Sequence, residues 1–277
     1  MVFLVLKVIT APLVIVMATL VPRRFGHTVS GLIIGLPLTS LPLLWLVALG
    51  HGATFAGSMS GATLTGTVAQ VVVIWVYATL ATRISPTLSM VGALAAFVVT
   101  AGLTQALHPS AGVVAVLAGT GFVIALRSWP RTSSAPVALG RYRLALRVVL
   151  SAGFTLVVVT LAGRIGPGLS GLAAALPVMS LIMAFVTHQE LGADASSRFL
   201  QGVTRGSFAY VVSMLVLTEL LQSGRMGLAF PLAIASAVVT QLAVQSLGSL
   251  LALTRAAGAS VASPTTSFER QTETSQI

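Results

Sequence analysis

Two short, similar segments carry the groups best suited to contact a substrate: residues 30–41 read SGLIIGLPLTSL and residues 170–181 read SGLAAALPVMSL. Pro37 and Pro177 each lie inside an apolar run. A proline there leaves the carbonyl group four residues earlier without its helical donor. In a membrane that carbonyl needs a hydroxyl partner or a water-lined cavity, and Ser40 and Ser180 supply hydroxyls nearby. The segments predict either two broken helices facing a central substrate site or two kinked helices that only pack.

The difference in residue number between Pro37 and Pro177 is called the repeat offset from here on. Other polar residues inside apolar runs recur at the same offset. Intramembrane amides cost free energy unless paired, so they indicate either a polar lumen or interhelical hydrogen bonds. Lys7 and Arg147 are basic residues at equivalent positions, each about one turn into an apolar run. They indicate either side chains that snorkel to the interface or symmetric cationic gates for an anionic substrate. The candidate substrate-binding residues are Pro37, Ser40, Gln70, Gln105, Pro177, Ser180, Tyr210 and Gln245, and the candidate gates are Lys7 and Arg147.

The sequence contains little that supports catalysis. It has no cysteine, and residues 1–189 contain neither Asp nor Glu. No spacing of His, Asp and Glu resembles a metal site, and the motifs of serine hydrolases, P-loop proteins and dinucleotide-binding proteins are missing. We therefore expect no enzyme, no metal and no cofactor. The net charge of +10 does not indicate nucleic-acid binding, because the basic residues lie in short loops beside apolar runs.

These residues are embedded in a chain that is 56% hydrophobic and only 7% charged. A soluble domain carries about 25% charged residues. The composition predicts an all-α polytopic membrane protein with nine transmembrane helices. The first apolar run has no basic segment before it, so we expect a retained span with its N-terminus outside. The nine runs cover about 4–22, 29–49, 63–82, 86–107, 111–128, 145–163, 168–188, 200–221 and 227–251.

The sequence also matches itself without gaps between residues 6–107 and 146–247. We therefore predict a duplication of a four-helix unit. The fifth run belongs to neither copy, so equivalent spans are five apart, an odd number, and the second copy is inverted. The predicted domains are repeat 1 (1–107), a linker helix with a basic cytoplasmic loop (108–143), repeat 2 (144–254) and a disordered cytoplasmic tail (255–277).

The distribution of basic residues gives the orientation. With nine spans and the N-terminus outside, only Lys7, Arg164 and Arg225 lie outside, and the other 12 of the 15 Lys and Arg residues are cytoplasmic. An eight-span arrangement with parallel repeats would place more of them outside, so the positive-inside rule favours nine spans. We expect a multi-pass protein of the bacterial inner membrane with a cytoplasmic C-terminus.

Residues 168–217 begin GLSGLAAALPVMSL and continue through a hydrophilic link to GSFAYVVSMLVL. This stretch resembles the GlpM-type bacterial membrane proteins of unassigned function, which look like half-size members of the drug/metabolite transporter superfamily. The resemblance implies a duplicated and fused pair of such units. Small multidrug exporters of that superfamily use a buried glutamate in their first span, whereas the matching segments around Val14 and Phe154 have none. A neutral or anionic substrate therefore fits better than a cationic drug.

The repeat favours a secondary transporter or flippase for a small metabolite or a lipid-linked intermediate, working by alternating access between the two halves. Its expected partners are the lipid bilayer and that substrate, and no nucleic acid is expected. Both a monomer and a homodimer are compatible with the sequence. The alternative is a non-transporting membrane scaffold, or an accessory subunit of an envelope-polymer biosynthesis complex, that uses the same small-residue faces to bind partner helices.

Overall fold

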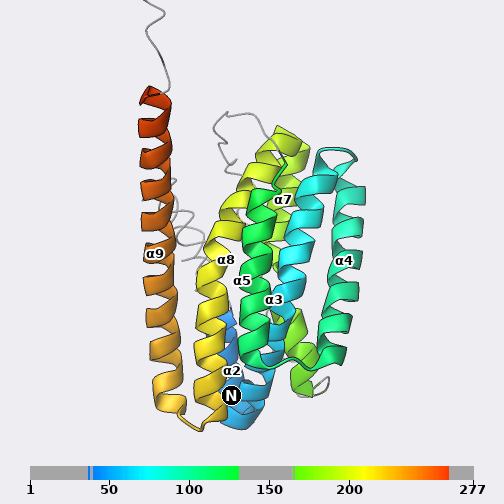
Figure 1. The fold of residues 1–277 in the computed structure, drawn as a ribbon. Helices are drawn as coiled ribbons and strands as arrows, with labels where there is room; N and C mark the ends of the chain where they lie inside the picture. Colours follow the sequence, from blue (N-terminus) through cyan, green and yellow to red (C-terminus); the bar gives the residue numbers. More distant parts are fainter. Residues whose placement is uncertain (1–36, 38–39, 131–163, 165, 262–277) are drawn as a thin grey trace, which may run out of the picture. The chain divides into compact units, whose positions relative to one another are not determined.

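The computed structural model describes Pro37, residues 40–130, Arg164 and residues 166–261, shown in colour in Figure 1. Within these residues every element is a helix and no strand occurs, which confirms the all-α prediction for the described part. Two predicted spans, about 4–22 and 145–163, and the candidate gates Lys7 and Arg147 lie outside the described residues. The chain divides into two compact units, residues 1–241 and 242–277.

The helix boundaries agree with the predicted apolar runs best where a run is apolar throughout. The run at 86–107 coincides with α4, and the run at 111–128 coincides within one residue with α5. The helix α9 continues through residues 255–261, the first part of the predicted tail. The described helices are α2 (Ser40–His51), α3 (Ala53–Ala81), α4 (Pro86–Leu107), α5 (Ala111–Arg127), α7 (Val178–Leu191), α8 (Ala193–Gln222) and α9 (Met226–Val261).

Two helices begin earlier than the hydropathy pattern predicts. The expected starts were about residues 63 and 200, but α3 begins at Ala53 and α8 at Ala193. The added turns carry small or polar residues that face neighbouring helices; Ser196, for example, is 0% exposed. Hydropathy measures affinity for lipid, so it underestimates helical segments whose side chains contact other helices.

A single glycine separates the helices of each hairpin. Gly52 lies between α2 and α3 with φ 87° and ψ 165°, and Gly192 lies between α7 and α8 with φ 85° and ψ 175°. This backbone region is open essentially to glycine alone. A Cβ atom at either residue would have no atom within 4 Å, so the backbone conformation, not space, requires glycine.

The two prolines occupy matching places at helix starts. The Pro37 carbonyl oxygen accepts a hydrogen bond from the Leu41 backbone N–H at 3.0 Å, and the Pro177 carbonyl oxygen accepts one from the Leu181 N–H at 2.9 Å. Pro177 also separates the helical residues 166–175 from α7, so the helix is interrupted there. The residues just before Pro37 lie outside the described part.

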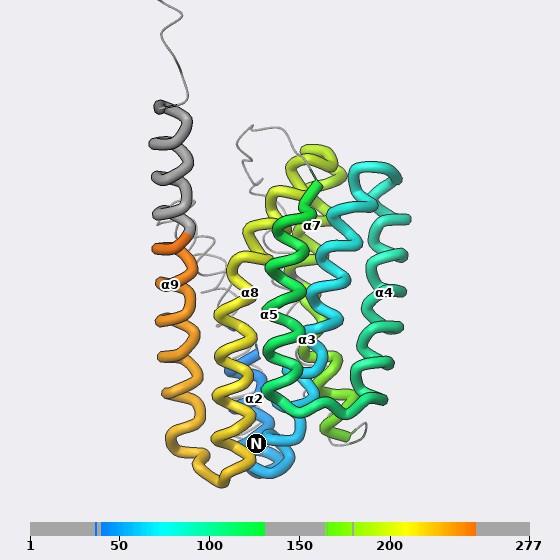
Figure 2. Tube along the Cα trace, in the orientation of Figure 1, coloured from blue at the N-terminus to red at the C-terminus, as the bar shows by residue number. Residues whose placement is uncertain are grey.

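The centre of the first unit is the antiparallel pair α3 and α8, whose opposite directions can be followed in Figures 1 and 2. A Cβ atom at Gly57 would lie 3.4 Å from the Leu221 Cβ atom. Further along, the Thr218 hydroxyl donates to the Ser60 hydroxyl at 3.2 Å. Residue numbers therefore rise along α3 as they fall along the facing side of α8. The helix α5 packs against both members of the pair.

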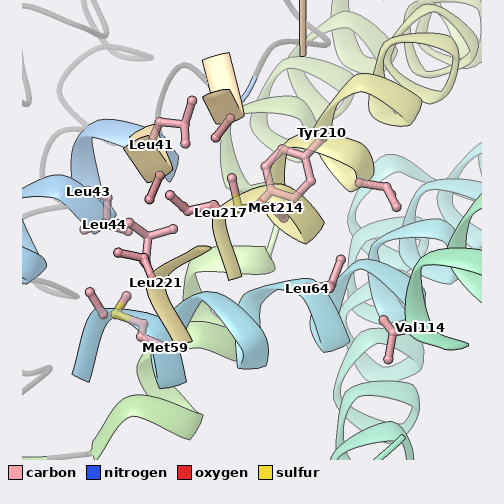
Figure 3. Close-up of a cluster of buried hydrophobic side chains, with 14 of the residues drawn as sticks. Leu41, Leu43, Leu44, Met59, Leu64, Val114, Tyr210, Met214, Leu217 and Leu221 are labelled. Carbon is pink, nitrogen blue, oxygen red and sulfur yellow. The ribbon is translucent and has the colours of Figure 1, made fainter. Parts of the chain in front are cut away.

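Two clusters of buried apolar residues hold the helices around this pair. The first joins α2, α3, α5, α8 and the start of α9, and Figure 3 shows part of it around Leu44, Met214 and Leu217. The second joins α3, α4, α7 and α8. Several members correspond at the repeat offset: Leu41, Leu44, Met214, Leu217, Leu221 and Ala233 in the first match Leu181, Ala184, Ile74, Tyr77, Ala81 and Ala93 in the second.

Among the described residues, five helical stretches are long and apolar enough to cross a membrane: Ala53–Ala81, Pro86–Leu107, Gly166–Leu191, Ala193–Gln222 and Met226–Leu247. The outer faces of α4 and α9 carry large apolar side chains over several turns. On α4 alone, Leu88, Val91, Val98, Val99, Leu103 and Leu107 are each at least 59% exposed. A soluble monomer rarely exposes so continuous an apolar face, whereas a membrane span requires one.

Candidate functional site

A buried hydroxyl pair joins the start of α2 to the middle of α8. The Ser40 hydroxyl and the Tyr210 hydroxyl lie 3.0 Å apart, and either can donate. The two residues are 4% and 9% exposed. Pro37 places Ser40 here, because its carbonyl accepts from Leu41 and so starts α2 directly against α8.

Gln70 on α3 reaches the same region of α8. Its Nε2 donates to the Ser207 hydroxyl at 3.5 Å, and Ser207 and Tyr210 lie one turn apart on one helix face. The Gln70 side chain is 6% exposed, and its Oε1 atom has no hydrogen-bond partner among the described residues. Ser40, Gln70, Ser207 and Tyr210 together form what we call the central polar seam.

The remaining predicted site residues lie elsewhere. Ser180 is half-buried on α7, three residues after Pro177. Gln105 lies near the end of α4, where its Nε2 atom would be 3.4 Å from a Cβ atom at Gly168. Gln245 belongs to the second unit, residues 242–277. The structure thus brings Ser40, Gln70 and Tyr210 together in the seam, whereas Gln105 packs against the start of the broken helix.

A second polar group, which the sequence did not predict, lies where α3, α7 and α8 meet. The Tyr77 ring packs edge-on to the His188 ring at a centroid distance of 6.3 Å. The Ser196 hydroxyl approaches the Tyr77 hydroxyl and donates to the Ala184 carbonyl oxygen at 2.8 Å. Thr187 is the neighbour of His188 and is 1% exposed. We call Tyr77, Thr187, His188 and Ser196 the α7 polar cluster.

The chemistry of both sites is hydrogen bonding by uncharged groups. Hydroxyl, amide and imidazole groups both donate and accept hydrogen bonds, and neither site includes a carboxylate, guanidinium or ammonium group. Within the described residues no three His, Asp or Glu side chains lie close enough to hold a metal ion. The arrangement can bind and orient a polar molecule.

Comparison with protein-family models, with curated proteins and with solved structures finds no match for this chain. The class of protein therefore follows from its own helices and surface. It is a multi-pass helical membrane protein, with polar residues buried between its central helices.

Proposed function

We propose that the protein is a secondary transporter or flippase that moves a small metabolite or a lipid-linked intermediate by alternating access between two inverted repeats. The observation that carries this proposal is the antiparallel packing of α3 against α8, two helices whose first residues, Ala53 and Ala193, are related by the repeat offset. Inverted repeats that meet in the membrane midplane are typical of secondary transporters.

Matching backbone details support the repeat. The Gly52 N–H donates to the Ala48 carbonyl at 3.0 Å, and the Gly192 N–H donates to the His188 carbonyl at 3.1 Å. The carbonyls of the two prolines accept at the same relative positions. Composition alone does not reproduce glycine junctions and proline contacts at one constant spacing, so we infer a duplication.

A difference between the halves supports alternating access. Ser40 and Tyr210 make their contact, and the residues at the equivalent positions are Ser180 and Gln70. Gln70 instead donates to Ser207, and its Oε1 atom has no partner among the described residues. When inverted repeats exchange conformations, one of two equivalent contacts is expected to form as the other opens.

We further propose that the chain is a fused pair of GlpM-type units in the bacterial inner membrane, with its N-terminus outside and its C-terminus in the cytoplasm. Neither the central polar seam nor the α7 polar cluster includes a carboxylate, which supports a neutral or anionic substrate over a cation. The role of Lys7 and Arg147 as gates for an anionic substrate remains a prediction.

The topology is tested with reporter fusions near His108 and near Val137, which flank the fifth span. Inverted repeats require the two sites to lie on opposite sides of the membrane. Reporters on the same side would contradict the inverted arrangement whatever the substrate.

Transport is tested in two stages. A thermal-shift screen with metabolites, amphiphilic cations and polyprenyl phosphates identifies a ligand, and proteoliposomes then measure its flux. We expect Pro37→Ala combined with Pro177→Ala to insert normally and to lower flux, since both substitutions remove a proline that predicts a broken helix. Unchanged flux would contradict a role for these prolines. Copurification with a stoichiometric partner, without any ligand-dependent shift, would instead support the scaffold function.

A further inference from the structure

The α7 polar cluster lies about two helical turns further along α3 than Gln70. Tyr77 is 0% exposed and Thr187 is 1% exposed. The Tyr77 hydroxyl, the Thr187 hydroxyl and the His188 Nδ1 atom are all buried, and among the described residues none of these three atoms has a hydrogen-bond partner. Three unpaired polar atoms on two adjacent helices form an unusual concentration, because buried polar groups in folded proteins are nearly always paired.

The other half of the chain supplies a direct comparison. At the repeat offset, Tyr77 corresponds to Leu217, Thr187 to Val47, His188 to Ala48 and Ser196 to Ala56. All four counterparts are apolar and at most 4% exposed. Four equivalent positions of this helix junction are therefore apolar in one half and carry hydroxyl and imidazole groups in the other.

The fold itself does not require polar groups at these four positions. The apolar version shows that these four positions pack well with apolar side chains. Each buried unpaired polar atom destabilises a folded protein. The α7 polar cluster thus costs stability that the fold does not require, which points to binding.

We propose that the α7 polar cluster is a binding site for an uncharged molecule rich in hydroxyl or amide groups. Tyr77, Thr187 and His188 each donate or accept, which matches groups that do both. The cluster itself offers no charge to pair with an ion, and burying an unpaired charge is costly. The nearby charged residues Glu190, Asp194 and Arg198 already interact with other groups.

If the protein is a transporter, this site names the class of its substrate, and that part of the proposal rests on the proposed function. Binding is therefore measured separately from flux. The probes are glucose and N-acetylglucosamine, which are uncharged, and gluconate and glucosamine, which keep the size and most hydroxyls but carry a charge. We expect the two uncharged probes to raise the melting temperature of the purified full-length protein, and the charged probes to leave it unchanged.

The decisive variant copies the apolar half into the polar one: Tyr77→Leu, Thr187→Val, His188→Ala and Ser196→Ala together. We expect it to fold with an unchanged or higher melting temperature and to bind the uncharged probes at least about tenfold more weakly, because several hydrogen bonds are lost. The matched control is Ser213→Ala. Like Ser196, Ser213 is 0% exposed and donates to a neighbouring helix carbonyl at 2.8 Å. It should keep the full shift.

A second measurement needs no ligand and uses the absence of cysteine from the sequence. Thr187→Cys and Val47→Cys are buried equally, at 1% and 0% exposure of the native residues. A ligand site must open to water, so we expect a membrane-permeant maleimide to label Thr187→Cys faster, and glucose to slow that labelling. The proposal is overturned if no uncharged probe binds, if the charged probes bind instead, if the fourfold variant keeps the shift, or if both cysteines react equally slowly.

Discussion

The hydroxyl groups of Ser40 and Tyr210 lie 3.0 Å apart in the buried interior, although 170 positions separate the residues in sequence. This contact ties the start of α2 to the middle of α8. It is the point at which a proline-containing segment of the first half meets a helix of the second.

Removing the Tyr210 hydroxyl should therefore destabilise the protein. Tyr210→Phe leaves the buried Ser40 hydroxyl without its partner, and we expect a loss of about 1–3 kcal/mol in the free energy of unfolding. Equilibrium unfolding in mixed micelles measures the change. Tyr77→Phe is the matched control: that hydroxyl only approaches the Ser196 hydroxyl and makes no hydrogen bond of normal length among the described residues, so its removal should cost less than removal of the Tyr210 hydroxyl. Equal losses in both variants would contradict this account.

Close packing of the broken helix on α3 gives a second prediction. A Cβ atom at Gly171 would meet the Met59 carbonyl oxygen and lie 2.8 Å from the Thr63 backbone nitrogen. Backbone atoms cannot move aside cheaply, so Gly171→Ala should lower the free energy of unfolding by about 1–3 kcal/mol. Gly119→Ala on α5 meets nothing within 4 Å and should be neutral or stabilising. If Gly171→Ala were as stable as Gly119→Ala, the two helices would not approach this closely.

The glycine junctions give a third prediction. Gly52→Ala and Gly192→Ala each force alanine into a backbone region that only glycine adopts easily, at a cost of about 1–3 kcal/mol. The two losses should be similar, because the two junctions have nearly the same φ. Gly202→Ala, at an open helical position, provides the control in the same unfolding measurement. A loss at only one junction would argue against equivalent hairpins.

Disulfide trapping tests the antiparallel register of α3 and α8. The Cβ position at Gly57 lies 3.4 Å from the Leu221 Cβ atom, near the separation that a disulfide needs. Gly57→Cys with Leu221→Cys should therefore cross-link under mild oxidation, as read on a non-reducing gel. The repeat predicts that the equivalent pair, Ala81→Cys with Ser197→Cys, cross-links as well. Gly57→Cys with Ser213→Cys, about two turns away along α8, should not.

The sequence predicted the helices best where lipid exposure alone shapes the residue pattern. For α4 the bounds agree because its outer face is apolar along its length, as Val98 and Val99 show at 68% and 69% exposure. The early turns of α3 and α8 were missed because a residue such as Ser196 faces another helix. Hydropathy does not distinguish a polar side chain in a loop from one buried between helices.

The candidate site was predictable in part. The repeat offset selected Ser40, Gln70 and Tyr210, which the fold gathers in one seam. Their actual contacts were not predictable, because Tyr210 faces Ser40 only through the crossing of α2 and α8. Tyr77 and Thr187 were missed because their polar character does not recur in the other half. Their signal is the opposite one, a polar residue in one half where the other half has an apolar one.

The single-glycine junctions have a mechanical consequence. Because α2 remains helical up to His51 and α3 begins at Ala53, the two torsion angles of Gly52 set most of the angle between these helices. The same holds for Gly192 between α7 and α8. Since α3 and α8 are antiparallel, the two joints lie at opposite ends of the central pair. The angle of each hairpin therefore depends on the two torsion angles of one residue, and the angle at one joint does not fix the angle at the other.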